Sequence, residues 1–117
     1  MKNAVAVAAF TALGQESRLN VFRLIVQRGD GGITPTEIVE LLGIHGATLS
    51  FHLKELSEAR LIASQKQGRS LIYRPQGRFV AQLVDFLSEN CCGGKPCGMP
   101  AEKVVTIKKK SPARSAK

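Results

Sequence analysis

Hydrophobic residues near the middle of the chain recur at helical spacing. Leu49, Leu53 and Leu56 follow one another at i, i+4 and i+7, which predicts one buried stripe on an amphipathic helix. The opposite side of this helix is expected to carry Ala47, Thr48, Phe51, His52 and Lys54. A second helical pattern spans residues 34–42, and Gly43 joins the two. Two helices with a short glycine-containing turn are typical of a helix-turn-helix motif.

Three more helical segments are predicted around this motif. Residues 4–13 are apolar with almost no polar face, so this helix should be buried, for example against a partner subunit. The next helix opens near Ser17, its candidate N-cap, and ends at Gly29. Its inward face is expected to hold Leu19, Phe22, Ile25 and Val26, and its outward face Arg18, Arg23 and Arg28. A last helix is predicted over residues 79–90, with an apolar stripe wider than a small core needs.

The helix over residues 34–42 begins with a capping box. Thr34 is the expected cap, Pro35 takes the first helical position, and Glu37 lies three residues after the cap. Its buried face is predicted to hold Ile38, Leu41 and Leu42.

After Arg60 the period changes from helical to alternating. Residues 61–66 and 70–74 predict two strands, and Gly68 between them can take the positive φ of a tight hairpin. The basic side chains of the hairpin are Lys66, Arg69 and Arg74. A helix-turn-helix followed by a basic hairpin predicts a winged helix-turn-helix, a mainly α fold with a small β-hairpin wing.

Much of the positive charge lies in the C-terminal tail. The net charge is +8, from 17 basic and 9 acidic residues, and residues 95–117 hold seven of the basic residues against one acid. Residues 1–94 hold ten basic and eight acidic residues, which gives only +2. Global charge is therefore weak evidence for nucleic-acid binding by the folded part, and the prediction depends on which residues lie where.

The helix over residues 46–56 has the chemistry of a recognition helix in a DNA major groove. The residues predicted to touch a double-stranded operator are His45, Ala47, Thr48, Ser50, Phe51, His52 and Lys54 on or beside this helix, with Lys66, Arg69 and Arg74 on the hairpin. The alternatives are an ordinary surface helix and a solvated hairpin. The apolar surplus of the first and last helices predicts a homodimer, hence a pseudo-palindromic operator.

Other function classes are disfavoured. No run of about 18 apolar residues predicts a membrane span, and the early apolar run lacks the features of a signal peptide, so a cytoplasmic location is expected. No cluster of nucleophile, base and orienting group, glycine-rich phosphate loop or carboxylate pair is visible, so neither an enzyme nor a catalytic cofactor is expected.

Three motifs in order carry a family resemblance. Residues 13–22 (LGQESRLNVF), 48–56 (TLSFHLKEL) and 68–73 (GRSLIY) resemble motifs of the ArsR-type family of dimeric winged helix-turn-helix, metal-responsive repressors. The resemblance runs from about Ala8 to Asn90, and His45 stands where relatives usually have Ser. Two sensor sites known in the family are excluded by ligand type. The helix before the recognition helix has no cysteine, and no histidine after His52 accompanies Asp85 on the last helix.

The cysteines predict a different sensor, made by Cys91, Cys92 and Cys97. Gly93 and Gly94 can end the last helix there, and Pro96 favours a turn that returns Cys97 to the pair. Three thiolates suit trivalent arsenic or antimony, whereas structural zinc usually takes four ligands. The chain is therefore predicted to be a repressor that arsenic(III) or antimony(III) releases as inducer. The alternatives are a redox sensor with a disulfide, cysteines without a role, and a DNA-binding protein without a ligand.

The predicted organisation has three parts. Residues 1–90 form the DNA-binding and dimerisation domain, residues 91–98 the metalloid-binding segment, and residues 99–117 a basic, disordered tail.

Overall fold

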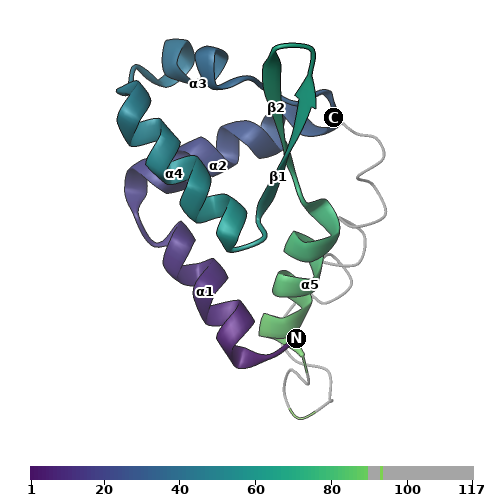
Figure 1. Cartoon of the computed structure of the whole chain (residues 1–117). Coiled ribbons are helices and arrows are strands. Elements are labelled where there is room, and N and C mark those ends of the chain that lie inside the picture. Colours follow the sequence, from purple (N-terminus) through teal and green to yellow (C-terminus); the bar gives the residue numbers. More distant parts are fainter. Residues whose placement is uncertain (90–92, 94–117) are drawn as a thin grey trace. The chain divides into compact units, whose positions relative to one another are not determined.

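The computed structural model describes residues 1–89 and residue 93 of the chain. Along these residues the elements follow in the order α1 (Asn3–Leu13), α2 (Glu16–Arg28), the 3-10 turn η1 (Gly29–Gly31), α3 (Pro35–Leu42), α4 (Gly46–Glu58), β1 (Ile62–Gln67), β2 (Ser70–Pro75) and α5 (Gly77–Ser88) (Figure 1). Contacts within the chain divide it into two units at Val80, part-way along α5. The first unit, residues 1–80, contains the helix-turn-helix and the hairpin.

The core of the first unit is built around α2, which contacts α1, α3, α4 and β2. Its fully buried side chains are Val21, Ile25, Ile33, Ile38, Leu49, Leu56, Leu61 and Ile62. The predicted stripe of α4 is confirmed, since Leu49, Leu53 and Leu56 are all buried. In α1 the buried residues are alanines, Ala6, Ala9 and Ala12, while Val7 and Phe10 remain exposed. Small side chains at this spacing let α1 approach α2 and α4 closely.

Three expectations, about the N-cap of α2 and the buried faces of α2 and α3, were wrong. Gln15 caps α2 instead of Ser17, because its side-chain oxygen accepts a hydrogen bond from the Arg18 backbone N–H at 2.7 Å. Leu19 and Val26 are exposed and Val21 is buried in their place. The apolar positions of α2 cover most of its circumference, so the sequence left the orientation of the helix open. On α3, Ile38 is buried but Leu41 is exposed.

The hairpin is antiparallel, with Ile62 opposite Pro75 and Gln67 opposite Ser70. Gly68 has a φ of 62° in its two-residue turn, as predicted. Ile33 extends the pairing, because its backbone exchanges two hydrogen bonds with Tyr73 at 3.0 and 2.8 Å. The preceding Gly32 is required here, since a Cβ on it would lie 2.2 Å from a side-chain carbon of Ile72. The wing is therefore fixed to the loop that leads into α3.

The last turn of α4 ends in a Schellman motif. The Leu61 N–H donates to the Leu56 carbonyl and the Arg60 N–H donates to the Ser57 carbonyl, both at 3.0 Å. Arg60 takes the left-handed position with a φ of 69°, which usually belongs to glycine. The motif turns the chain from the recognition helix directly into β1.

Candidate nucleic-acid interface

The turn between α3 and α4 depends on Gly43. This residue ends α3 with a left-handed φ of 64°, and its N–H donates to the Val39 carbonyl at 2.8 Å. His45 then precedes the first turn of α4 without a side-chain capping bond, and it is exposed. The predicted helix-turn-helix is therefore confirmed, with α4 as its second helix.

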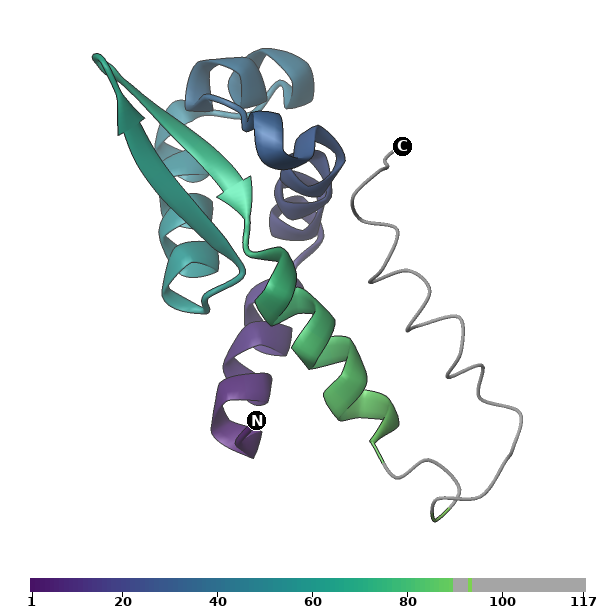
Figure 2. The same cartoon turned by 90° about the vertical axis from the view of Figure 1, so that its right-hand side faces the viewer.

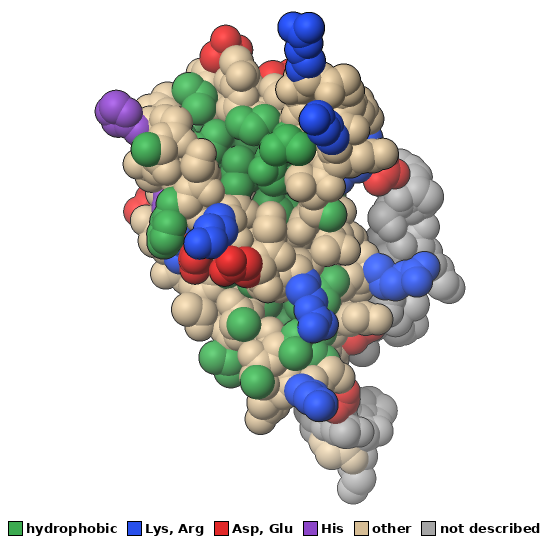
Figure 3. All heavy atoms as spheres, viewed as in Figure 1, with side chains coloured by type: hydrophobic (Ala, Val, Ile, Leu, Met, Phe, Trp, Pro, Cys, Tyr) green, Lys and Arg blue, Asp and Glu red, His purple; other side chains and the backbone are tan. Residues whose placement is uncertain are grey.

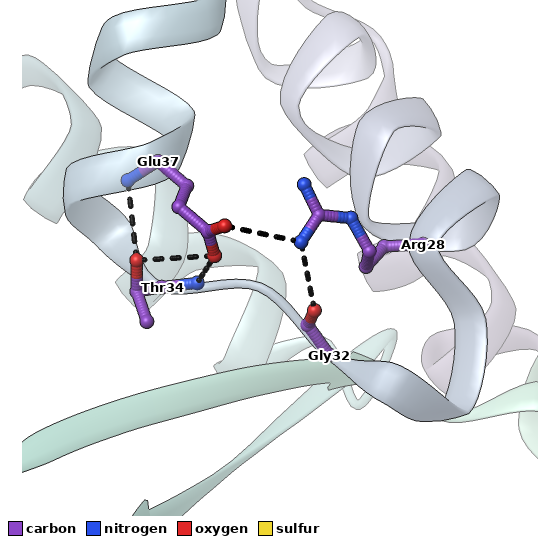
Figure 4. Close-up of polar contacts among 4 residues, drawn as sticks. All are labelled: Arg28, Gly32, Thr34 and Glu37. Atoms are coloured by element: carbon purple, nitrogen blue, oxygen red, sulfur yellow. Dashed lines mark hydrogen bonds and ion pairs between the residues drawn. The ribbon is translucent and has the colours of Figure 1, made fainter.

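The start of α3 is held by a capping box and an ion pair (Figure 4). The Glu37 N–H donates to the Thr34 hydroxyl at 3.2 Å, and the Thr34 N–H donates back to the Glu37 carboxylate at 3.0 Å. Arg28 of α2 lies 3.3 Å from the same carboxylate and 3.4 Å from the Gly32 carbonyl oxygen. The Thr34 backbone bond, followed by the bond from Arg28, lowers the pKa of Glu37. These contacts join α2, the loop and α3 ahead of the recognition helix.

Most residues predicted to face DNA lie exposed on or beside α4. These residues are His45, Ala47, Thr48, Ser50, Phe51 and Lys54. The only acidic residues of α4 are Glu55 and Glu58, both near its end, so its first two turns carry small, polar, aromatic and basic side chains. Backbone N–H groups at the start of a helix add a positive dipole end that favours phosphate. The geometry of this face suits DNA contact.

The prediction that His52 lies on this face was wrong, because His52 is buried, with 5% of its surface exposed. It follows Leu49 by three residues and precedes Leu56 by four, which places it on the apolar stripe. That spacing was the signal in the sequence that could have identified a buried histidine. Burial, and secondarily the nearby Arg18 cation, lowers the pKa of His52.

The wing offers two exposed cations, Lys66 and Arg69, while Arg74 already has partners. Figure 2 shows the tip of the hairpin projecting beyond the helices on the side of α4. Arg74 donates from Nε to the Asp30 carbonyl oxygen at 2.8 Å and from Nη1 to the Gln65 side chain at 2.5 Å. These bonds brace the base of the wing against η1. Figure 3 shows lysine and arginine side chains around the hairpin.

Arg18 is a residue that the sequence analysis placed wrongly on the outward face of α2. It is half-buried, its Nε donates to the Ala12 carbonyl oxygen at 2.6 Å, and its Nη1 lies 3.4 Å from Nδ1 of His52. Its position three residues before Val21 and four before Phe22 puts it on the buried stripe of α2.

The predicted sensor residues Cys91, Cys92 and Cys97 lie outside the described residues, as do residues 99–117. Within residues 1–89 and residue 93, no group of three or more His, Cys, Asp or Glu side chains is arranged to hold a metal ion. In the same part of the chain, no helix is long and apolar enough to cross a membrane.

Known proteins share both the sequence motif and this architecture. A family model described as a helix-turn-helix domain matches residues 13–65. The transcriptional regulator NmtR of Mycobacterium tuberculosis is 29% identical over 82 residues, which make up 70% of this chain and 66% of NmtR. An ArsR-like transcriptional regulator from Rhodococcus sp. RHA1 superposes with a TM-score of 0.68 at 21% identity, covering 97% of this chain and 96% of that one.

Residues 13–65 form a helix-turn-helix domain, and the chain is similar to ArsR-type winged helix-turn-helix transcriptional regulators. The resemblance and the fold predicted from the three motifs are thereby confirmed. A homodimeric winged helix-turn-helix DNA-binding domain from Mycobacterium bovis has the same fold, with a TM-score of 0.60 at 22% identity over 82% of this chain and 89% of that one. The winged helix-turn-helix fold thus supplies the helix and wing of the candidate interface.

Proposed function

We propose that this protein is a transcriptional repressor of the ArsR type. It binds a pseudo-palindromic operator as a homodimer and releases it when arsenic(III) or antimony(III) binds Cys91, Cys92 and Cys97. The observation that carries the DNA-binding part is the exposed face of α4, which presents polar and basic side chains beside the exposed cations of the wing. Two copies of α4 in a symmetric dimer would enter successive major grooves about 34–36 Å apart.

Within this proposal the residues have distinct tasks. His45, Ala47, Thr48, Ser50 and Phe51 lie against base edges or adjacent phosphates, and Lys54, Lys66 and Arg69 neutralise phosphates. Arg74 positions the wing through its bonds to Asp30 and Gln65, so its contribution to binding is mainly indirect. His52 acts from inside the unit and does not contact DNA.

The test of DNA binding uses an operator selected from a random duplex pool by the full-length protein. Thr48→Ala should weaken binding to the selected duplex by about 1–3 kcal/mol and leave binding to a scrambled duplex unchanged. Arg69→Ala should weaken both and lower the slope of log affinity against log salt by about 1. Thr36→Ala on α3 and Arg23→Ala on α2 are matched controls with exposed parent residues. Selection of no sequence, or equal effects of variants and controls, would refute the proposal.

The sensor part is supported by the chemistry of three thiols in a seven-residue segment, with Gly93 in between at a φ of 65°. Arsenous acid exchanges its three hydroxyls for three thiols and releases three waters, with no change in oxidation state and no net proton release. Ordinary thiol pKa values are therefore no obstacle. The three sulfurs complete the coordination of arsenic(III), whose lone pair takes the remaining direction.

The sensor test replaces each cysteine with serine and follows operator release by arsenite or antimonite in a thiol-free reductant. An allosteric coupling of about 1–3 kcal/mol predicts roughly 5–150-fold weaker DNA binding by the loaded parent protein. The triple Cys→Ser variant has no thiol and should stay on DNA. If it responds like the parent, the sensor lies elsewhere. If peroxide releases DNA and arsenite does not, the protein is a thiol-redox sensor.

A further inference from the structure

The Arg18 side chain contacts two helices besides its own. Its Nε donates to the Ala12 carbonyl oxygen at 2.6 Å, in the last turn of α1. Its Nη1 lies 3.4 Å from Nδ1 of His52, and its guanidinium carbon lies 5.9 Å from the centroid of the Phe51 ring, both on α4. One half-buried cation therefore connects the end of α1 to the recognition helix.

The contact with α1 has a clear electrostatic reason. The last four carbonyls of a helix have no partner within the helix, and the C-terminal end carries partial negative charge. No basic residue lies in the last turn of α1. Arg18 supplies that cation from α2 and satisfies one of the free carbonyls, so the guanidinium is held in place from this side.

The contact with His52 fixes the other side. A guanidinium can only donate hydrogen bonds, so Nδ1 of His52 accepts and the ring proton sits on Nε2. Nε2 is buried and has no hydrogen-bond partner among the described residues. Arg18 is thus the polar partner that sets the tautomer and orientation of this buried ring.

Phe51 is the adjacent residue on α4, but it lies on the outer surface with 55% of its area exposed. Its ring is tilted by 53° against the His52 ring, at a centroid distance of 6.1 Å. A cation near an aromatic ring within about 6 Å is attracted to the ring. Arg18 therefore contacts both the buried and the exposed aromatic residue of the recognition helix.

We infer that Arg18 is a positioning residue for sequence recognition, which holds the Phe51 ring where it packs against the 5-methyl group of a thymine in the operator. This inference rests on the proposed DNA contact of α4. A phenyl ring has no hydrogen-bonding atom, and in the major groove the thymine methyl is the apolar group that it can recognise. The guanidinium stays inside the protein and contacts no base.

The experiment replaces each thymine of the selected operator in turn with deoxyuridine, which lacks only that methyl group. The full-length parent should lose about fourfold in affinity at one thymine per half-site, as expected for one buried methyl. Phe51→Ala should bind thymine and deoxyuridine duplexes equally. Arg18→Met should also lose the discrimination, because the ring is no longer held.

Arg23→Met is the matched control, since it removes the same charge from an exposed site on the same helix. It should keep the fourfold discrimination even if overall affinity falls. Arg18→Lys keeps the charge but lacks the fork that reaches both the Ala12 carbonyl and His52, so it should behave like Arg18→Met. The ¹⁵N shifts of His52 should report the Nε2–H tautomer in the parent and a change in both Arg18 variants.

The outcomes separate this inference from the proposed function. If the parent selects no sequence, DNA recognition itself fails. If it selects one but discriminates at no thymine, or if both Arg18 variants discriminate as well as Arg23→Met, the inference is wrong and the repressor proposal stands. Circular dichroism checks folding, and should Arg18→Met unfold, Arg18→Lys and Phe51→Ala decide the result.

Discussion

At the scale of single residues, one position in the middle of α4 and one just after its end are held in states that cost free energy. His52 is buried as a neutral ring beside a cation, and Arg60 takes a left-handed backbone conformation. In both cases the surrounding fold supplies the compensation, through packing on the apolar stripe and through the Schellman hydrogen bonds. Each cost can be measured separately.

The lowered pKa of His52 predicts a loss of stability in mild acid. Its usual pKa is about 6.5, so above that pH the ring is neutral in both the folded and the unfolded state and this histidine adds no pH dependence to stability. As pH falls, the unfolded chain binds a proton that the folded state excludes. We expect the urea midpoint of the parent to fall between pH 7.5 and 5.5. His52→Asn, which keeps an acceptor for Arg18, should show a smaller change. An equal change in both proteins would contradict this assignment.

This pH window excludes Glu37, whose pKa is lowered from 4.5 and whose contribution is lost only in stronger acid. The carboxylate keeps its hydrogen bonds to Thr34 and Arg28 across the whole range used for His52.

Arg60→Gly should stabilise the protein. In a non-glycine residue at φ 69°, the close contact between Cβ and the backbone costs about 1–2 kcal/mol. Glycine removes this cost, but it also raises the conformational entropy of the unfolded chain, which offsets part of the gain. We expect a net gain of roughly 0.5–1 kcal/mol in the free energy of unfolding. Arg60→Ala is the control, since it removes the charge but keeps the Cβ. A gain in Arg60→Ala as large as in Arg60→Gly would mean that charge, not backbone strain, is responsible.

At the scale of elements, α3 is the part most dependent on local hydrogen bonds. It has eight residues and only Ile38 is fully buried, so packing contributes little and the capping box contributes much. The bonds from Arg28 to the Gly32 carbonyl and to Glu37 tie the start of α3 to α2. Because α3 supports α4 through the turn at Gly43, loss of the cap at Thr34 should also affect the position of α4.

Thr34→Ala should lower the free energy of unfolding by about 1 kcal/mol, the usual cost of a lost N-cap. Thr34→Ser keeps the hydroxyl and should lose little. Thr36 lies two residues after the cap and is exposed, so Thr36→Ala should have almost no effect on stability. Chemical denaturation compares the three. Should Thr36→Ala and Thr34→Ala lose stability equally, helix propensity rather than the cap would be the cause.

At the scale of the whole molecule, the exposed apolar residues are the surface on which we expect a second copy of the chain to bind. Val7 and Phe10 are exposed on α1, and Val84 and Leu87 on α5. These four side chains are not part of the buried core. Burying them against a second chain removes apolar area from water, which is the main driving force for association. This supports the proposed homodimer through the terminal helices.

Val7→Glu should convert the dimer to a folded monomer, because a charge buried in an apolar interface is costly. Leu41→Glu on α3 is a close match, since both parent side chains are 60% exposed, and it should remain dimeric. Sedimentation equilibrium at micromolar concentration distinguishes the two. A monomeric parent would overturn the dimer, and a monomer formed only by Leu41→Glu would move the interface to α3.

The sequence by itself determined the elements whose signals are local. The capping box at Thr34, the glycine turn at Gly68 and the leucine stripe of α4 follow from backbone chemistry and helical period, and all three lie where predicted. Most of the exposed positions of α4 followed as the other side of that stripe. Local signals are reliable here because the interacting groups are at most a few residues apart.

Only the tertiary structure decided which polar side chains partner one another inside the unit. His52 and Arg18 stand 34 positions apart, and the half-buried guanidinium of Arg18 contacts both the buried His52 ring and the end of α1. Leu19, Val26 and Leu41 are exposed because none of the elements within residues 1–89 covers them. Helical periodicity predicts the centre of an apolar face but not which residues at its edges are buried. Whether an edge residue is buried depends on the position of the adjacent helix, which is set by packing in the folded unit.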